Sequence, residues 1–455
     1  MDNKEVTVNI EKLIYGGQAL ARLDDYPVFI DGGCPEDTVI VDVIKRNKTY
    51  GIGKIKEIVK PSDKRVKPFC PLHKVCGGCG VQHIDYAEQL KQKQLIVEET
   101  LEKIYGKKLN VMPVKAPENN KNYRYKVQYP VSQTKVSERI LAGYYKKGTH
   151  EIVNIKYCPV QPQILDEITE FIRTKAAELK ISGYNEKKHS GMLRHIIYRM
   201  SKFNGEILII LVLNSDMADK KVKKLAEELG KINKVSGVAA NFNTAKTNVI
   251  QGKKYQTLFG KDFITEKIGE IIYKISAGSF FQVNPDSAEI IFNTAKEMIM
   301  KNTKNPVILD AYSGVSSFGL QMKDIAKEVI CVEESKSSTD DAAENVKINH
   351  VDNVTVINDD AAKVFEQFVR EEKKFDVILL DPPRKGCSEQ ALDYAAKLSK
   401  EIIVYVSCNP SSLARDLKYL GKKGFTAENV QPVDMFCHTP HIENVVLIRK
   451  QNDLH

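Results

Sequence analysis

Hydrophobic and polar positions alternate in short stretches through the first sixty residues of the chain. Apolar or alternating runs predict five strands, at 6–10, 20–23, 28–30, 38–45 and 50–59. Turns that contain glycine or aspartate separate these runs. Five short strands in so few residues predict a small closed β-barrel of the OB-like kind at residues 1–61.

The middle of the chain mixes helical and strand patterns. A basic segment bounded by prolines, 61–68, is expected to be a linker, and residues 85–105 have the periodicity of an amphipathic helix. Further helices are predicted at 163–178 and 218–232, and strands at 205–213 and 235–242. We therefore expect an α+β central domain over residues 62–272.

The remaining residues, 273–455, alternate strand and helix regularly. Strands are predicted at 307–312, 328–332, 354–358, 375–380 and 402–406. This alternation predicts an α/β domain with a doubly wound, Rossmann-like sheet. Polar residues, among them Glu333, Asp381 and Cys408, follow the carboxyl ends of the strands, where ligands bind in such sheets. We expect one continuous site at that edge.

The first two strand ends indicate the ligand. Glu333 stands about 20 positions after the first turn, where an acidic residue can accept hydrogen bonds from a ribose diol. The turn contains Gly314 but has Ser316 where a dinucleotide fingerprint has its second glycine. Without a pyrophosphate cradle, the pattern favours an adenosyl ligand that lacks phosphates, namely S-adenosylmethionine. A purely structural role of Glu333 is the alternative.

Composition and charge add RNA as a partner. The chain has 455 residues, of which 42% are hydrophobic and 28% charged, as is typical of folded multidomain proteins. The net charge of +9 is concentrated: residues 45–67 hold nine cations against two anions, and residues 108–156 hold ten against three, with tyrosines in between. Cations beside aromatic rings suit single-stranded RNA, and a solvated lysine-rich surface is the alternative.

The sequence shows neither a membrane span nor an export signal. The longest apolar run, 207–213, has seven residues, whereas a membrane span needs about 20. The first residues have neither a basic start nor an apolar stretch. We therefore expect a cytoplasmic protein and, because no obligate protein partner is evident, a monomer.

Four of the nine cysteines suggest a metal centre. Cys70, Cys76 and Cys79 are spaced C-x5-C-x2-C around a Gly-Gly turn, and Cys158 can supply a fourth thiolate. In a reducing cytosol, clustered thiols favour a metal over disulfides. Four thiolates fit an iron-sulfur cluster or structural zinc, and the spacing, which is not that of zinc ribbons, favours iron-sulfur. Four unrelated buried thiols are the alternative.

Six further segments occur in a fixed order along the chain. They are 280–284 (FFQVN), 310–312 (DAY), 332–333 (VE), 380–386 (LDPPRKG), 407–416 (SCNPSSLARD) and 438–443 (HTPHIE). Together they resemble the ordered motifs of bacterial RNA uracil-5-methyltransferases, and the resemblance covers the whole chain. It implies that the barrel is an RNA-binding TRAM domain. It also implies the roles of six residues: S-adenosylmethionine contacts for Gln282, Tyr312, Glu333 and Asp381, the nucleophile for Cys408 and the base for Glu443.

The same resemblance bears on the cysteines and on the target. It implies that Cys70, Cys76, Cys79 and Cys158 are the ligands of a four-iron four-sulfur cluster, as in the ribosomal RNA branch of the family. Bacterial tRNA enzymes of this family usually lack the cluster and the barrel, so the resemblance favours 23S ribosomal RNA over tRNA. One departure is 313–316, which reads Ser-Gly-Val-Ser where family members commonly have Cys-Gly-x-Gly.

The chemistry of uracil explains why such an enzyme needs a cysteine and a base. Carbon 5 is a poor nucleophile, but a thiolate that adds to carbon 6 makes an enolate whose carbon 5 can attack a methyl group. A base then removes the proton on carbon 5, and the cysteine is eliminated. Cys408 ends the fifth predicted strand, and Glu443 precedes a last strand at 444–449. Because Cys408 lies near the start of a helix, we expect a lowered thiol pKa.

Other functions fit parts of the pattern less well. Cytosine-5 methyltransferases place a Pro-Cys after the fourth strand, where this chain has Asp381 and two prolines. Radical S-adenosylmethionine enzymes need an open iron site, and Cys158 leaves none. An RNA-binding ribosome-assembly factor with a decayed methyltransferase fold would explain the altered glycine turn, but Cys408 and Glu443 are intact.

Overall fold

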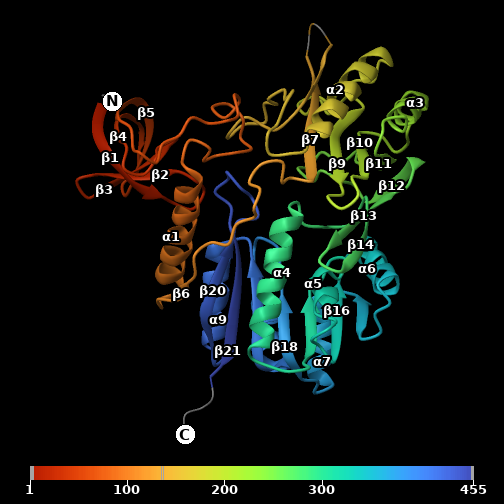
Figure 1. Cartoon of the computed structure of the whole chain (residues 1–455). Coiled ribbons are helices and arrows are strands. Elements are labelled where there is room, and N and C mark those ends of the chain that lie inside the picture. The colour runs from red at the N-terminus through yellow and green to blue at the C-terminus, as the bar shows by residue number, and fades with distance from the viewer. Residues whose placement is uncertain (1–4, 135, 137, 452–455) are drawn as a thin grey trace.

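The computed structural model describes residues 5–134, 136 and 138–451. The chain forms an N-terminal barrel, a central domain and a C-terminal sheet domain, which lie at the upper left, upper right and bottom of Figure 1. Within the described ranges, no helix combines the length and the apolar character that crossing a membrane requires.

The N-terminal barrel is closed, as the sequence predicted, with the strand order β1-β2-β3-β5-β4. Its strands are β1 (Glu5–Leu13), β2 (Ala19–Leu23), β3 (Tyr26–Asp31), β4 (Thr38–Arg46) and β5 (Gly51–Lys60). Alternate positions of β4, such as Val39 and Val41, are fully buried, as expected for strands that surround a core.

The segment 61–68 is attached to the barrel and is not a free linker. Arg65 forms an ion pair of 2.5 Å with Asp37, whose side chain is fully buried, and its backbone bridges to Ile84. The Arg65 guanidinium therefore neutralises an internal carboxylate and is not available to RNA in the way that the basic run suggested.

The central domain contains a six-stranded sheet in the order β12-β11-β10-β9-β7-β8. Its strands are β7 (Lys126–Gln133), β8 (Ile140–Ala142), β9 (Leu193–Met200), β10 (Ile207–Leu213), β11 (Val235–Phe242) and β12 (Lys254–Gly260). Helices α2 (Gln163–Glu178) and α3 (Lys220–Leu229) pack on one face. The other face joins the core of the C-terminal domain through the hairpin β13 (Phe263–Ile268) and β14 (Ile271–Ser276), so every residue of β10 is buried.

This sheet corrects part of the RNA hypothesis. Tyr123 and Tyr129, two of the tyrosines between the cations of 108–156, are 2% and 0% exposed and belong to the core. Tyr123 donates a hydrogen bond to the Cys437 carbonyl, and Tyr129 donates one to Gln161. These rings are therefore not available to stack on bases, because they fill the interior of the domain.

The C-terminal domain has an eight-stranded sheet in the order β17-β16-β15-β18-β19-β21-β20-β6. Its strands are β15 (Val307–Ala311), β16 (Glu328–Glu333), β17 (Val354–Asn358), β18 (Phe375–Leu380), β19 (Ser399–Ser407), β20 (Phe425–Val433), β21 (Glu443–Lys450) and β6 (Asn110–Val111). The strands from β17 to β19 are parallel, whereas β21 runs antiparallel to both β19 and β20. The doubly wound prediction is confirmed.

Helices cover both faces of this sheet. One core contains side chains of α4 (Pro285–Met300) and α5 (Ser317–Gln321), and α6 (Lys336–Ile348) packs beside β14 and β17. The core on the other face contains side chains of α1 (Tyr86–Tyr105), α7 (Ala361–Arg370), α8 (Glu389–Leu398) and α9 (Pro410–Gly421).

Two parts of the expected central domain, 62–272, belong structurally to the C-terminal domain. Helix α1 packs against α9, and β6 pairs in parallel with β20 as an edge strand of the large sheet. The expected boundary after residue 272 also falls inside β14. The reason is that the apolar face of α1 is covered by side chains that lie about 300 residues later in the sequence.

Candidate active site

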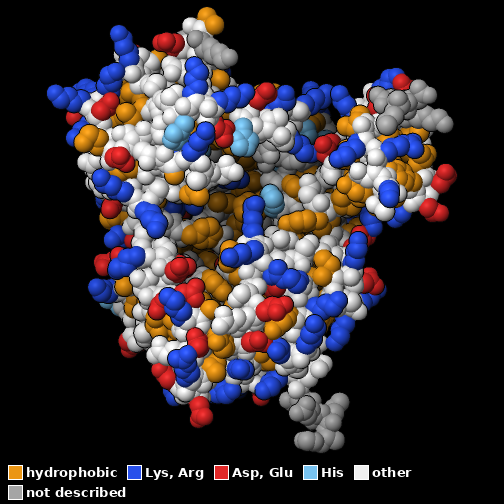
Figure 2. Space-filling view, turned by 180° about the vertical axis from the view of Figure 1, so that it is seen from behind, with side chains coloured by type: hydrophobic (Ala, Val, Ile, Leu, Met, Phe, Trp, Pro, Cys, Tyr) orange, Lys and Arg blue, Asp and Glu red, His pale blue; other side chains and the backbone are white. Residues whose placement is uncertain are grey.

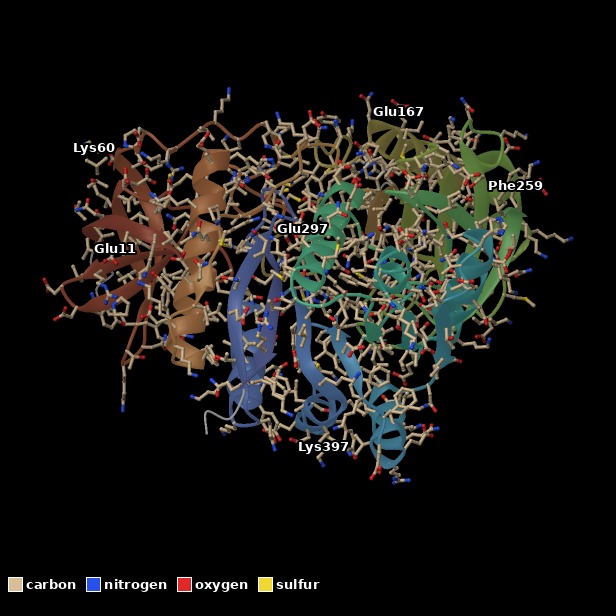
Figure 3. All side chains as sticks on the ribbon, turned by 60° about the horizontal axis from the view of Figure 1, so that its bottom comes forward. Glu11, Lys60, Glu167, Phe259, Glu297 and Lys397 are labelled. Carbon is tan, nitrogen blue, oxygen red and sulfur yellow. The ribbon has the colours of Figure 1, made fainter. Side chains whose placement is uncertain are left out.

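The carboxyl ends of four adjacent parallel strands meet where the C-terminal domain faces the other two domains. In Figure 3, Lys397, just before β19, marks the end of the sheet opposite to these carboxyl ends. The labels Glu11 and Lys60 mark the barrel, and the labels Glu167 and Phe259 mark the central domain. Figure 2 shows that one face of the molecule is hollowed at its centre, with hydrophobic side chains inside the hollow and cations around it. The site therefore lies where the three domains converge.

Strand register places three predicted residues side by side. Ala311 pairs with Val332 on one side and with Leu380 on the other, so Tyr312, Glu333 and Asp381 each follow a paired residue. The Glu333 carboxylate accepts hydrogen bonds from the backbone N–H groups of Gly314 (2.9 Å) and Ser335 (2.8 Å). These two bonds fix its orientation and leave further lone pairs for a ligand.

The turn after β15 has an unusual backbone. Tyr312, Gly314 and Ser316 have φ angles of 62°, 58° and 60°, all in the left-handed region. Glycine adopts this region readily, whereas the two other residues do so at a cost of about 1–2 kcal/mol each. Such strain clusters at ligand sites. The altered glycine turn therefore keeps a glycine-like conformation at Ser316.

Buried acids lie under this turn. Burial raises the pKa of Asp310 to about 8, with a further contribution from Asp381, and burial raises the pKa of Asp381 to about 7. One Asp310 oxygen accepts from the Gly319 N–H at 2.9 Å, but Oδ1 of Asp310 and the Ser313 hydroxyl are buried and have no hydrogen-bond partner among the described residues. Carboxyls with raised pKa values and unpartnered polar atoms suit a polar, positively charged ligand.

Gln282 lies on the loop between β14 and α4, and this loop passes the same turn. The Phe280 carbonyl oxygen is 4.0 Å from the position that a Cβ on Gly314 would take. Gln282, however, is one of the residues that line a small cavity together with Lys126, Arg199 and Glu266. The structure thus brings the loop to the turn and does not join Gln282 to the other three predicted residues by a direct contact.

Cys408 and Glu443 face one another at the ends of β19 and β21. Ser407 pairs with Asn444 in the antiparallel register, so the next positions, Cys408 and Glu443, are opposite each other. Asn444 donates to the Ser407 carbonyl at 3.2 Å and keeps the two strand ends together. The Cys408 side chain is partly exposed, and Glu443 is 7% exposed.

The electrostatics of this pair differ from the expectation. The pKa of Cys408 is raised to about 11, mainly by burial and also by Glu443 and Asp381, while Arg384 opposes the shift. Burial also raises the pKa of Glu443 well above its usual value, together with Asp381 and against Arg384. The expected lowering of the thiol pKa is therefore wrong, because burial and the neighbouring acids raise it.

The loop that leads to Glu443 is held by several segments. Lys93 of α1 forms a buried ion pair of 2.6 Å with Asp434, and the Tyr86 hydroxyl donates to the same carboxylate at 2.7 Å. The Val81 N–H donates to the His438 carbonyl, and the Phe69 ring lies edge-on to His438 with centroids 4.8 Å apart. In Figure 1 this loop, dark blue, rises from the sheet toward α1.

The four predicted metal ligands lie together. Cys70, Cys76, Cys79 and Cys158 all line one cavity, which Tyr123 and Arg124 also border. Burial raises the pKa of Cys79 to about 11. Across the described residues, no group of three or more His, Cys, Asp or Glu side chains is arranged to hold a single metal ion. The structure thus gathers the thiols around one space and does not show a metal centre.

Comparison with known proteins relates these sites to a family. A family model described as tRNA (Uracil-5-)-methyltransferase matches residues 85–451, and one described as TRAM domain matches residues 1–56. The chain belongs to the tRNA (uracil-5-)-methyltransferase family. The barrel of this methyltransferase is thus a TRAM domain, which confirms that part of the prediction.

Relatives of this methyltransferase match along nearly its whole length. An uncharacterized RNA methyltransferase of Halalkalibacterium halodurans is 37% identical over 453 residues, covering 99% of this chain and 98% of that protein. One from Clostridium tetani is 37% identical over 442 residues, covering 96% and 94%. A solved structure, the Pyrococcus abyssi tRNA (uracil-54, C5)-methyltransferase with S-adenosyl-L-homocysteine, is 26% identical to this chain and has a TM-score of 0.76. The match covers 97% of this chain and 99% of the Pyrococcus abyssi chain.

These comparisons confirm an RNA methyltransferase that uses S-adenosylmethionine. Further residues at or near the site were not predicted from the sequence. Asn444, which is fully buried, follows Glu443 directly. Lys93 and Asp434 form an ion pair although they are far apart in the sequence. Tyr15, in the barrel turn between β1 and β2, lies near the Cys408 end of the methyltransferase domain. Only Tyr15 had a sequence signal, an aromatic residue just before a Gly-Gly hairpin turn.

Proposed function

We propose that this methyltransferase transfers a methyl group from S-adenosylmethionine to carbon 5 of a uridine in 23S ribosomal RNA, through a covalent bond between Cys408 and carbon 6. The observation that carries the proposal is the register of β19 and β21, which sets Cys408 opposite Glu443 at the sheet edge that also holds Asp381. A nucleophile and a proton acceptor are thereby positioned for the same base.

The proposed reaction uses these residues in order. The Cys408 thiolate bonds to carbon 6, and the ring electrons move toward carbon 5 and oxygen 4. Carbon 5 takes the methyl group, and S-adenosylhomocysteine leaves. The Glu443 carboxylate accepts the proton of carbon 5, the bond between sulfur and carbon 6 breaks, and the thiolate is restored. The raised pKa of Glu443 makes its ionised form a strong proton acceptor, and Arg384 favours the thiolate of Cys408.

The methyl donor is a sulfonium ion, and we assign four residues to it: Gln282, Tyr312, Glu333 and Asp381. The Glu333 carboxylate, fixed by two backbone N–H groups, can accept the ribose hydroxyls. Asp310 and Ser313 offer buried acceptors without partners beside the same turn. These features support a polar cationic ligand at this edge.

We further propose that the four-cysteine cavity holds a four-iron four-sulfur cluster. All four thiols reach one space, and no disulfide joins any of the cysteines in the described part of the chain. Cysteine thiolates are the usual ligands of such clusters. We assign the cluster a structural role, because the reaction transfers no electrons.

A second target, tRNA, is favoured by one observation. The solved Pyrococcus abyssi protein acts on uracil 54 of tRNA and matches 97% of this chain, a length that includes the barrel. The barrel therefore does not by itself separate the two substrates, and the preference for 23S ribosomal RNA rests on the cysteine cluster.

Methyl transfer to unmodified transcripts tests the function. Purified protein is incubated with tritiated S-adenosylmethionine and either 23S ribosomal RNA or a tRNA pool, and labelled 5-methyluridine is measured. We expect label in the ribosomal RNA. Label in tRNA alone would establish the second target, and RNA binding without any label would favour the assembly-factor alternative.

Two variants test the covalent route. Cys408→Ala should abolish methyl transfer while leaving RNA affinity within about two-fold, because only the nucleophile is removed. Glu443→Gln should accumulate a denaturant-stable protein–RNA adduct, because elimination stalls. The double variant is the matched control and should give no adduct. Normal turnover by Glu443→Gln would refute its role as the base.

A further inference from the structure

The turn between β1 and β2 reaches the catalytic edge of another domain. Gly17, with a φ of 83°, lies against Pro440: a Cβ added at Gly17 would stand 2.9 Å from the Pro440 Cβ. Pro440 lies three residues before Glu443. Any side chain at position 17 would therefore separate the turn from the catalytic loop.

Contacts behind the turn hold it in place. The Gly17 N–H donates to the Ile14 carbonyl, and the Ile14 N–H donates to the Gln18 carbonyl, both at 2.9 Å. The Leu13 N–H donates to the Gln92 side chain of α1 at 2.8 Å, in a buried position. The barrel turn is thus tied to a helix of the C-terminal domain, which fixes its place over the site.

The side chain at the tip of this turn is Tyr15. It is 39% exposed, and its hydroxyl forms no hydrogen bond with the described residues. Burial raises its phenol pKa, and the groups that act on it electrostatically are Cys408 and Glu443, which raise the pKa, and Arg384, which lowers it. A partly exposed ring thus lies within electrostatic range of Cys408, Glu443 and Arg384, on a turn that contacts Pro440.

We propose that Tyr15 stacks its ring on a base of the RNA substrate at the mouth of the catalytic site, so that the TRAM barrel contributes a substrate contact there. Aromatic rings stack on bases of any identity, and a partly exposed ring that has no internal hydrogen bond is free to do so. The barrel then positions the strand next to the reacting uridine as well as attracting its phosphates. This inference rests on the proposed function for the identity of the reacting base.

Two substitutions separate the ring from the hydroxyl. Tyr15→Ala should lower kcat/KM for RNA by about 10- to 100-fold, as expected for loss of one stacked base, whereas Tyr15→Phe should stay within about two-fold of the wild type. Tyr50→Ala is the matched control, because Tyr50 is a barrel tyrosine of similar exposure, 36%. A Tyr15→Phe variant as slow as Tyr15→Ala, or a Tyr15→Ala variant as fast as Tyr50→Ala, would overturn the proposal.

Abasic RNA substrates provide a readout that a merely structural role would not move. Removing single bases around the target should slow methyl transfer by the wild type at one position, where the base that stacks on Tyr15 is lost. The same removal should not slow Tyr15→Ala further, because this variant has no ring to stack on that base. Equal effects on both enzymes at every position would contradict stacking.

RNA affinity keeps this test separate from the test of function. Fluorescence anisotropy with the same transcripts should show weaker binding by Tyr15→Ala than by Tyr50→Ala, with or without methyl transfer. Weaker binding by Tyr15→Ala together with an inactive wild type would refute the proposed function but support the Tyr15 contact. Equal binding by both variants together with an active wild type would refute the Tyr15 contact but support the proposed function.

Discussion

At the scale of single residues, burial is the largest influence on the pKa values of the acidic groups and of Cys408 at the site. Cys408 lies just before α9, a position that usually favours a thiolate, yet its pKa is raised to about 11. Burial and the acids Glu443 and Asp381 raise this pKa, whereas Arg384 and a hydrogen bond from the Cys408 backbone lower it. The free protein therefore holds Cys408 mainly as a thiol, and the proposed reaction would begin from the small ionised fraction.

Alkylation of Cys408 by iodoacetamide should follow this ionisation. Between pH 7 and 10 its rate should rise about tenfold per pH unit, because the thiolate fraction grows tenfold per unit below the pKa. Arg384→Gln should slow alkylation at each pH by removing the cation that favours the thiolate. The rate is measured by mass spectrometry of the Cys408 peptide, and Lys385→Gln is the control. A pH-independent rate would contradict the raised pKa.

Ser316 allows a test of backbone strain. Ser316→Gly should raise the free energy of unfolding by about 1 kcal/mol, because glycine adopts a φ of 60° without the clash of a Cβ. Urea denaturation measures the change. Ser317→Gly, at the first residue of α5, should instead lower stability by about 0.5 kcal/mol, because glycine has a lower helix propensity than serine. Destabilisation by both variants would show that position 316 is not strained.

The sequence predicted which residues lie at the strand ends, but it did not predict how deeply they are buried or which charges surround them. Glu333, Asp381 and Cys408 could be assigned to one edge because parallel strands end together. The sign of the Cys408 pKa shift depends on Glu443 and Arg384, which come from other elements of the fold. A one-dimensional pattern does not show how deeply a side chain is buried or which charges surround it.

At the scale of elements, α1 illustrates what periodicity can and cannot predict. Its extent agrees with the predicted helix at 85–105, because its apolar positions repeat with helical spacing. Its partner, α9, could not be predicted, since an apolar stripe does not identify what covers it. The edge strand β6 is only two residues long, too short to carry any pattern.

The ion pair between Lys93 and Asp434 should be important for the attachment of α1. Both side chains are buried, 3% and 0% exposed, so Lys93→Met would leave a carboxylate without its cation. We expect a loss of about 3–5 kcal/mol in the free energy of unfolding. Chemical denaturation measures it, and Lys91→Met, an exposed neighbour on α1, should change stability by less than about 1 kcal/mol. In the double variant Lys93→Met and Asp434→Asn, part of the loss should be recovered; no recovery would contradict the pairing.

At the scale of the whole molecule, the three-part architecture was predictable and the contacts between the parts were not. Runs of short strands and the strand–helix alternation identify the barrel and the large sheet. The shared core between the central and C-terminal domains, through β13 and β14, joins side chains far apart in the sequence. The tyrosines buried in the central sheet show the same limit, because composition alone suggested that they bind RNA.

Loss of the proposed cluster should affect more than the central domain. Cys76→Ser should reduce bound iron and visible absorbance, and it should lower the thermal unfolding temperature, because Phe69 and Val81 on either side of the cysteines contact His438 in the loop that leads to Glu443. Iron analysis and thermal melts measure both effects. Cys34→Ala, a buried barrel cysteine outside the cavity, should keep its iron. Unchanged iron in Cys76→Ser would refute the ligand assignment.

The pairing of β6 with β20 has a consequence for biosynthesis. As the nascent chain leaves the ribosome, α1 and β6 emerge early, yet the strand and helix that cover them are made about 300 residues later. The barrel can close at once from local contacts, whereas the segment behind it must wait, with its apolar side unprotected, until translation is nearly complete. A chaperone that binds exposed apolar segments should therefore bind this protein after α1 and β6 emerge. It should release the protein only after α9 and β20 have been synthesised.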